Sequence, residues 1–185
     1  MRFAWLGLCI APLFLTACGY QFQGEKNPFQ ELGIRRIYVT EFRNETFRPG
    51  IEHLFTSAMV RELEKSKIFV LVDSKSKADA ILSGVVTEAA TGPSSTTAIT
   101  VRGTDQQVAA QYNASITCGV SLTEVSGRPV FSHSVTRSKQ YPGTALTGAE
   151  GATVPLLNES EERLAYQFLA TSMMSNAYQN MVDLF

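Results

Sequence analysis

A long run of strict alternation constrains this chain more than any other feature. Between residues 112 and 123, apolar residues occupy every second position, and the positions between them hold only Asn, Ser, Thr or Gly. A period of two is the period of a β-strand, so the run predicts a strand with one face in a core and one polar face. Cys118 falls on the apolar face, and we interpret it as a packing residue because a buried cysteine behaves as a small hydrophobe.

Two other segments have the helical period. From Ile51, apolar residues recur at i+3, i+4, i+7, i+8 and i+12, which predicts an amphipathic helix of about 15 residues. Near the end of the chain, Asn158 and Glu161 have the spacing of a capping box, and the apolar stripe that follows them predicts a last helix. Each helix has one apolar face, so each must pack on another layer.

Further β-branched and aromatic runs predict strands over residues 34–42, 68–72, 78–91 and 129–141, with Gly84 as a bulge or close-approach position. Segments rich in Gly, Pro, Ser and Thr predict loops over residues 44–50, 91–107 and 141–157. The order predicts an α+β two-layer sandwich: a mixed sheet of about four to five strands with two helices on one face. The first strand–helix–strand unit should be a right-handed parallel crossover, and the later strands an antiparallel meander.

The first residues have the features of an export signal. Arg2 precedes an apolar run over residues 3–15, which is shorter than the roughly 20 residues that a membrane span needs and is interrupted by Pro12. The next residues, Leu15-Thr16-Ala17-Cys18, resemble a bacterial lipobox. That resemblance implies cleavage before Cys18 and acylation of this residue, and a glycine at position 19 implies transfer to the outer membrane. An ordinary secretion signal followed by a chance cysteine is the alternative.

These patterns divide the chain into a cleaved lipoprotein signal peptide (1–17), an acylated tether (18–33) and a single α/β sandwich domain (34–185). The chain has 185 residues, and one domain is the default for that length. Acyl chains form a stable anchor because each buried methylene contributes roughly 0.8 kcal/mol. The expected mature protein is lipid-anchored on the periplasmic side of the outer membrane.

Composition argues against several classes of function. The 16 basic and 17 acidic residues leave no positive excess, so no nucleic-acid partner is expected. The two histidines and three cysteines do not fall at zinc-ligand spacing, and no catalytic or cofactor motif is recognisable, so neither a metal, a cofactor nor an enzyme is expected. A lipid-anchored hydrolase built on His133 with Asp79 or Glu124 is the catalytic alternative, although it has no evident nucleophile.

Four motifs resemble the lipopolysaccharide-assembly lipoproteins of the LptE type. They are Cys18-Gly19-Tyr20-x-Phe22, Ile37-x-Val39-x-x-Phe42-x-Asn44-x-Thr46, Gly50-Ile51-Glu52 and Ala78-Asp79-Ala80-x-Leu82-x-Gly84. The resemblance implies a sheet with two helices packed on it. It also implies that the protein plugs and helps assemble an LptD-type β-barrel translocon and assists lipopolysaccharide insertion. The implied partners are that barrel, lipopolysaccharide, and outer-membrane lipid through acylated Cys18.

The same resemblance suggests one binding residue. The basic contact of the family lies in a loop before the alternating strand, where this chain has Arg102. A guanidinium matches phosphate oxygens with two hydrogen bonds, so Arg102 is the candidate for binding lipopolysaccharide. A solvated loop arginine is the alternative. A second family lysine has no counterpart here, because Asn158 and Glu159 stand at its place.

The motif around Ile37 also resembles lipoproteins that activate peptidoglycan synthases or line secretion channels. Those proteins usually carry a long linker that can cross the periplasm. The tether predicted here has about 15 residues and reaches at most ~50 Å. This length favours a partner in the outer membrane itself.

Overall fold

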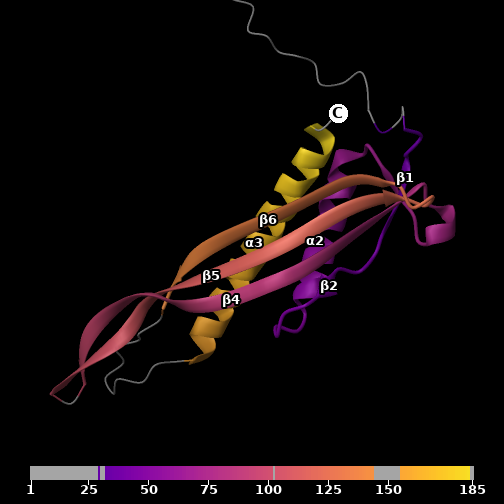
Figure 1. Cartoon of the computed structure of the whole chain (residues 1–185). Helices are drawn as coiled ribbons and strands as arrows, with labels where there is room; N and C mark the ends of the chain where they lie inside the picture. The colour runs from indigo at the N-terminus through magenta and orange to yellow at the C-terminus, as the bar shows by residue number, and fades with distance from the viewer. Residues whose placement is uncertain (1–28, 30–31, 102, 144–154, 184–185) are drawn as a thin grey trace, which may run out of the picture.

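Three long antiparallel strands form most of the sheet: β4 (Ala80–Val101), β5 (Thr104–Glu124) and β6 (Pro129–Pro142). The computed structural model describes residues 29, 32–101, 103–143 and 155–183. Its short strands are β1 (Arg36–Val39), β2 (Arg43–Asn44) and β3 (Val70–Leu71). The strand order is β3-β1-β4-β5-β6, with β2 also paired to β4 (Figure 1).

The first half of the fold is parallel and the second half antiparallel. Strand β1 is parallel to both β3 and β4, and α2 (Ile51–Ser66) connects the β1–β2 segment to β3. The predicted first strand is interrupted, since residues 40–42 separate β1 from β2. A single 3-10 turn, η1 (Lys75–Lys77), precedes β4. The predicted parallel strand–helix–strand unit and the antiparallel meander are both present.

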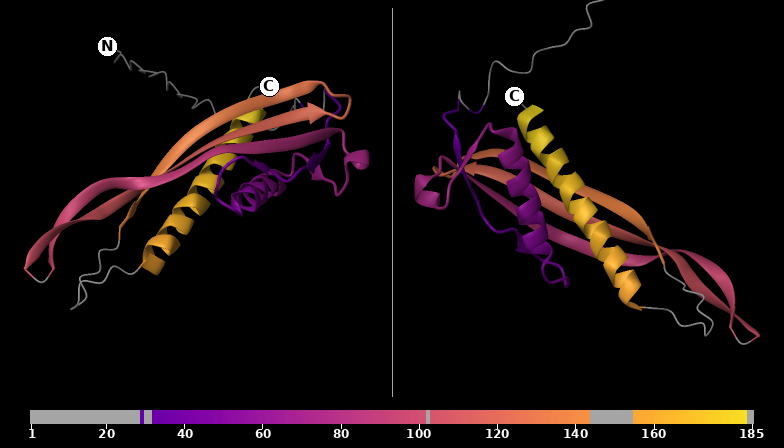
Figure 2. Two further views of the ribbon diagram at one scale, coloured as in Figure 1. Left: turned by 60° about the horizontal axis from the view of Figure 1, so that its bottom comes forward. Right: turned by 180° about the vertical axis from the view of Figure 1, so that it is seen from behind.

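Both helices cover the same face of the sheet. The second of them, α3 (Pro155–Asp183), runs beside α2 and across β5 and β6 (Figure 2). The expected α+β two-layer sandwich with a mixed sheet is therefore confirmed. The core lies between the layers, and its fully buried large side chains include residues of both helices and of the sheet: Phe55, Leu63, Leu82, Ile116, Leu122, Leu169 and Met173.

The alternating run behaves as its pattern predicts. Every second side chain of β5 from Ala114 to Leu122 is buried, including Cys118. Gly84, on the neighbouring β4, allows a close approach rather than forming a bulge. A Cβ at this position would lie 2.3 Å from a ring carbon of Phe42, which covers the glycine. The register irregularities in β4 fall instead between Val86 and Glu88 and between Pro93 and Thr96.

The prediction of a loop over residues 91–107 is wrong. Strands β4 and β5 continue through this segment as a two-stranded ladder, to the pair Val101 and Thr104. Strand β6 ends where Pro142 pairs with Gln111, so residues 96–101 and 104–110 project beyond the sandwich (Figure 1). We call these two segments the ribbon. The threonines at 96, 97 and 100 favour extended backbone because they are β-branched, and this preference outweighed the loop-like composition.

The predicted start of the last helix is also wrong. Helix α3 includes Pro155, so Asn158 lies inside its first turn and does not cap it. Proline suits the first turn of a helix, because its φ is already helical and its missing N–H group would have no partner there. The predicted signal peptide and most of the predicted tether lie outside the described residues.

Candidate functional site

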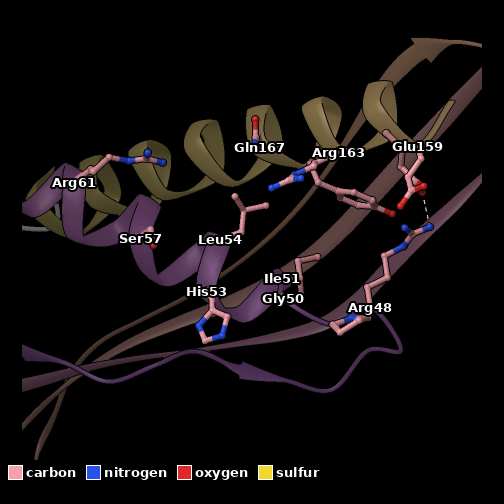
Figure 3. A pocket seen from close by; sticks show the side chains of 13 residues that line it. Arg48, Gly50, Ile51, His53, Leu54, Ser57, Arg61, Glu159, Arg163 and Gln167 are labelled. Atoms are coloured by element: carbon pink, nitrogen blue, oxygen red, sulfur yellow. Dashed lines mark ion pairs between the residues drawn. The ribbon is translucent and has the colours of Figure 1, made fainter. Parts of the chain in front are cut away.

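A groove separates α2 from α3 (Figure 3). Its lining comes from residues 48–50, from α2 as far as Arg61, and from α3 between Glu159 and Gln167. Its volume is about 610 Å³. Sites for small ligands usually occupy about 300–1,000 Å³, so the groove has the size of a binding site.

A four-residue spacing on each helix puts the polar groove residues on one face of that helix. On α2, His53, Ser57 and Arg61 are four residues apart, so they share one face of the helix. On α3, Glu159, Arg163 and Gln167 have the same spacing and lie opposite them. These polar residues sit on the exposed side of two helices whose apolar sides face the sheet.

A tightly bonded turn forms one end of the groove. The Asn44 amide donates to the Arg48 carbonyl oxygen (2.7 Å) and to a Glu52 carboxylate oxygen (2.8 Å). The same side chain accepts hydrogen bonds from the backbone N–H and the hydroxyl of Thr46 (2.8 and 2.7 Å). This turn presents Phe47 with its side chain fully exposed to solvent. Asn44 thus fixes the backbone that carries Arg48 to the groove.

Arg48 connects this turn to α3 and, through α3, to the sheet. Its guanidinium pairs with Glu162 and lies 4.8 Å from the centroid of the Tyr166 ring. The Tyr166 hydroxyl is hydrogen-bonded to the Thr91 hydroxyl of β4 at 2.7 Å. Burial raises the pKa of Tyr166, and burial together with the charge of Glu162 raises the pKa of Tyr141 to about 12. Both phenols are therefore neutral hydrogen-bonding groups at physiological pH.

The sheet face away from the helices is the second candidate surface. On β5 and β6, the outward positions hold short uncharged side chains: Asn113, Ser115, Thr117, Gly119, Ser121, Thr123, Ser132, Ser134, Thr136, Ser138 and Gln140. We call these residues the outer face. Their hydroxyls bond across strands, as between Ser83 and Ser121 and between Thr117 and Thr136, both at 2.9 Å. The result is a polar surface with few long side chains.

The residues that sequence reasoning assigned to function are not among those that build these surfaces. Cys18 and Arg102 both lie outside the described residues, so acylation and lipopolysaccharide binding at these positions stay predictions. Val101 and Gly103, on either side of Arg102, lie at the far end of the β4–β5 hairpin. The groove residues were missed, although the four-residue spacing of Ser57 with Arg61 and of Glu159 with Arg163 was visible.

The residues considered for a hydrolase are separately engaged. Asp79 bonds to Arg36, and Glu124 bonds to Arg128 and Ser126. The His133 ring stacks on Phe131 at 6.1 Å. Burial raises the pKa of the Cys118 thiol to about 12, so this residue is not a thiolate nucleophile at neutral pH. The described contacts do not assemble a nucleophile with a base.

The described part of the chain offers neither a metal site nor a membrane-spanning helix. No cluster of three or more His, Cys, Asp or Glu side chains there could hold a metal ion. Among the described helices, none combines the length and the apolar character that a membrane span requires.

Comparison with known proteins identifies the family. The model of the family described as "LptE: Lipopolysaccharide-assembly" matches residues 34–181. A variant of the PelC dodecamer from Paraburkholderia phytofirmans has a similar structure, with a TM-score of 0.52 and 18% identity over 80% of this chain and 89% of that chain. That likeness shows a common fold.

Two weaker likenesses are a putative lipoprotein from Caulobacter crescentus and the rare lipoprotein B from Shewanella oneidensis. Their TM-scores are 0.49 and 0.48, each at 10% identity. They cover 78% and 81% of this chain, and 89% and 96% of their own chains. No curated protein sequence matches. Because the family model matches residues 34–181, well over half of the chain, this chain belongs to the LptE lipopolysaccharide-assembly family.

Proposed function

We propose that this chain is an outer-membrane lipoprotein that plugs and helps assemble an LptD-type β-barrel and assists the insertion of lipopolysaccharide. The family match over residues 34–181 carries this proposal. The LptE family acts with the lipopolysaccharide transport machinery, and the barrel is the specific partner that we propose. The role is one of binding and steric occupation, not of catalysis.

The outer face supports a position inside a barrel. Barrel lumens are polar, so a plug needs a surface that can exchange hydrogen bonds with a polar wall. Ser and Thr hydroxyls can do this at short range. They also lose less conformational freedom than Lys or Glu, for which immobilisation costs roughly 1.5–2 kcal/mol each. A face of short hydroxyls is therefore suited to close contact with a wall.

The positions of β1 and the ribbon at opposite ends of β4 support anchoring at the β1 end. Strand β1, where the folded domain begins, pairs with residues 80–82 of β4, whereas the ribbon is the opposite end of the same strand. A tether from acylated Cys18 would hold the β1 end near the membrane. The ribbon would then extend away from the point of attachment, along the axis of the barrel.

Arg102 is our candidate for direct contact with lipopolysaccharide. The residues beside it end the ribbon, which reaches furthest from β1. Lipopolysaccharide carries phosphate groups, and an arginine can hold a phosphate with two parallel hydrogen bonds. We expect Arg102→Glu to weaken cross-linking to lipopolysaccharide at least tenfold. Arg137→Glu, the same charge reversal on β6, is the control and should have little effect.

Affinity purification tests the main proposal. Tagged, acylated protein is isolated from detergent-solubilised outer membrane, and the proteins that accompany it are identified by mass spectrometry. We expect a near-stoichiometric barrel of the lipopolysaccharide translocon. Recovery of a peptidoglycan synthase or of secretion-channel subunits instead would overturn the plug role. A Cys18→Ala variant should lose acylation and outer-membrane fractionation, which tests the anchor separately.

A further inference from the structure

Two arginines that face the groove have no partner in the described part of the chain. Arg61 extends from α2 and Arg163 from α3, and Figure 3 shows both guanidinium groups over the space between the helices. Neither makes an ion pair or a hydrogen bond with a described residue. Arg48, in the same groove, pairs with Glu162, and His53 pairs with Glu41 through a 2.6 Å contact. Among the described groove residues, Arg61 and Arg163 are therefore unpaired, whereas Arg48 and His53 are paired.

The charges of the lining are unevenly distributed. Glu159 and Glu162 lie at the end next to Arg48, whereas Arg61 lies at the other end and Arg163 between (Figure 3). Cations on facing helices repel each other, and an anion between them would convert that repulsion into two attractions. Guanidinium groups match the oxygen geometry of phosphate and bind it in parallel hydrogen bonds. The basic end of the groove is thus complementary to a phosphate.

Uncharged side chains also line the groove beside the two arginines. Leu54 of α2 lines it and packs partly against the core, and Ser57 and Gln167 add neutral polar groups. An apolar side chain beside two arginines suits a ligand that carries both a charge and an apolar chain. The volume of about 610 Å³ is sufficient for a head group with its first chain atoms.

We propose that the groove between α2 and α3 binds the phosphate head of an anionic amphiphile. In this site Arg61 and Arg163 hold the phosphate oxygens, and Leu54 contacts the beginning of the apolar chain. The inference rests on the proposed function only in that this function brings the chain to phosphorylated amphiphiles. It does not involve Arg102 or the barrel.

Binding of short-chain lipids tests the proposal. Acylated protein in neutral phosphatidylcholine nanodiscs is titrated with dihexanoyl phosphatidic acid, dihexanoyl phosphatidylcholine or inorganic phosphate, and binding is followed by calorimetry. We expect phosphatidic acid to bind at least tenfold more tightly than either of the other two probes. Phosphatidylcholine keeps the phosphate but esterifies it with the cationic choline, so its equal binding would overturn the recognition of an anionic head group by Arg61 and Arg163. Equal binding of inorganic phosphate would overturn the role of the apolar chain.

Charge-neutralising variants assign the binding to the groove. Arg61→Gln combined with Arg163→Gln should weaken phosphatidic acid binding at least tenfold. Arg35→Gln combined with Arg137→Gln removes the same charge from exposed sites outside the groove and should change the affinity less than twofold. All four arginines are exposed, so the thermal unfolding of both variants should match the parent. Equal affinities of the two double variants would refute the site.

The outcome is separable from that of the plug proposal. Purification of the barrel does not depend on Arg61 or Arg163, so the double variant should still recover it. Loss of lipid binding with retention of the barrel is the result that we expect. If parent protein recovers no barrel yet binds phosphatidic acid through these arginines, the plug role fails and the groove site stands.

Discussion

The sandwich and the ribbon are built from the same two strands, yet they are held together differently. Within the sandwich, β4 and β5 bury Leu82, Val86, Ile116 and Leu122 under two helices. In the ribbon, no described side chain is buried, and apart from the hydrogen bond from the Gly143 N–H to the Ala110 carbonyl at its base, each strand pairs only with the other. A hydrogen-bonded ladder can thus continue well beyond the core that stabilises it. Strand propensity and cross-strand pairing suffice for the extension once the core has set the register.

The two regions also differ in how they manage exposed edges. Within the sandwich, both sides of β5 are paired, by β4 and β6. The ribbon has two open edges, and the register shifts at its base, between Pro93 and Thr96, increase its local twist. A twisted edge is a poor template for unwanted strand pairing. The ribbon can therefore remain exposed until a partner covers it.

The largest effect on stability is expected from the removal of an aromatic side chain from the core. Phe55 of α2 is fully buried, so Phe55→Ala should lower the free energy of unfolding by about 3–5 kcal/mol. Thr97→Ala, in the ribbon, should change it by less than about 0.5 kcal/mol. Urea denaturation followed by circular dichroism measures both. Similar losses for the two variants would show that the ribbon carries stability that its lack of burial does not suggest.

A second test adds a methyl group to the sandwich and to the strand segment beside the ribbon. Gly84→Ala would place a Cβ against the Phe42 ring and should cost about 1–3 kcal/mol through overpacking. Gly92→Ala is the matched control on the same strand. It meets nothing within 4 Å and should be neutral or slightly stabilising.

Relief of the clash identifies its cause. In a Phe42→Leu background, Gly84→Ala should cost less than in the parent, and a double-mutant cycle in urea measures the difference. An unchanged cost would assign the effect to the backbone of β4 and not to the ring.

A smaller effect is expected for the carboxylate that joins β1 to β4. The Arg36 guanidinium bonds to Asp79 at 2.7 Å, and the backbone N–H groups of Arg35 and Arg36 also donate to it. These bonds, that of the guanidinium first, lower the pKa of Asp79 to about 2. Its stabilising effect is thus complete above the unfolded pKa, near 3.9, and is lost as the pH falls from about 4 towards 2.

Asp79→Asn should therefore lower the free energy of unfolding at pH 7 by about 1–2 kcal/mol and flatten its slope below pH 4. Asp105→Asn, a carboxylate change in the ribbon, should stay within about 0.5 kcal/mol at pH 7. Urea titrations at several pH values measure both. An unaltered acid slope in the Asp79 variant would show that this carboxylate does not link β1 to β4 energetically.

The contrast also explains which parts of the fold the sequence predicts. Burial produces a periodic pattern, so the alternation around Cys118 and the helical stripe from Ile51 predicted the elements that cover the core. The ribbon is exposed on both faces and has no such pattern, so its small polar residues were interpreted as a loop. Asn158 is a similar case, because its spacing to Glu161 fits a capping box in a helix that had already begun.

The candidate sites, like the fold, could be predicted from the sequence only in part. Spacing alone places Ser57 and Arg61 on one helical face. It does not show which residues of another helix lie opposite them. That α3 lies opposite with Arg163 depends on how both helices pack on the sheet, which only the tertiary structure determines. The motif around Asn44 was recognised as a family feature. Its physical role, a turn that directs Arg48 towards Glu162, requires the hydrogen bonds of the folded chain.

Removal of the ribbon is expected to change the stability less than Asp79→Asn does. Replacing residues 94–111 by Asn-Gly would close β4 and β5 after the pair Pro93 and Tyr112 with a two-residue hairpin turn. Tyr112 would be kept because its ring stacks on Tyr141 at 5.6 Å and belongs to the core. Since the deleted segment buries no described side chain, the free energy of unfolding should change by less than about 1 kcal/mol. The same variant should lose cross-linking to lipopolysaccharide, because it lacks Arg102. A large loss of stability would instead mean that the ribbon supports the sandwich, and the two regions would then form one cooperative unit.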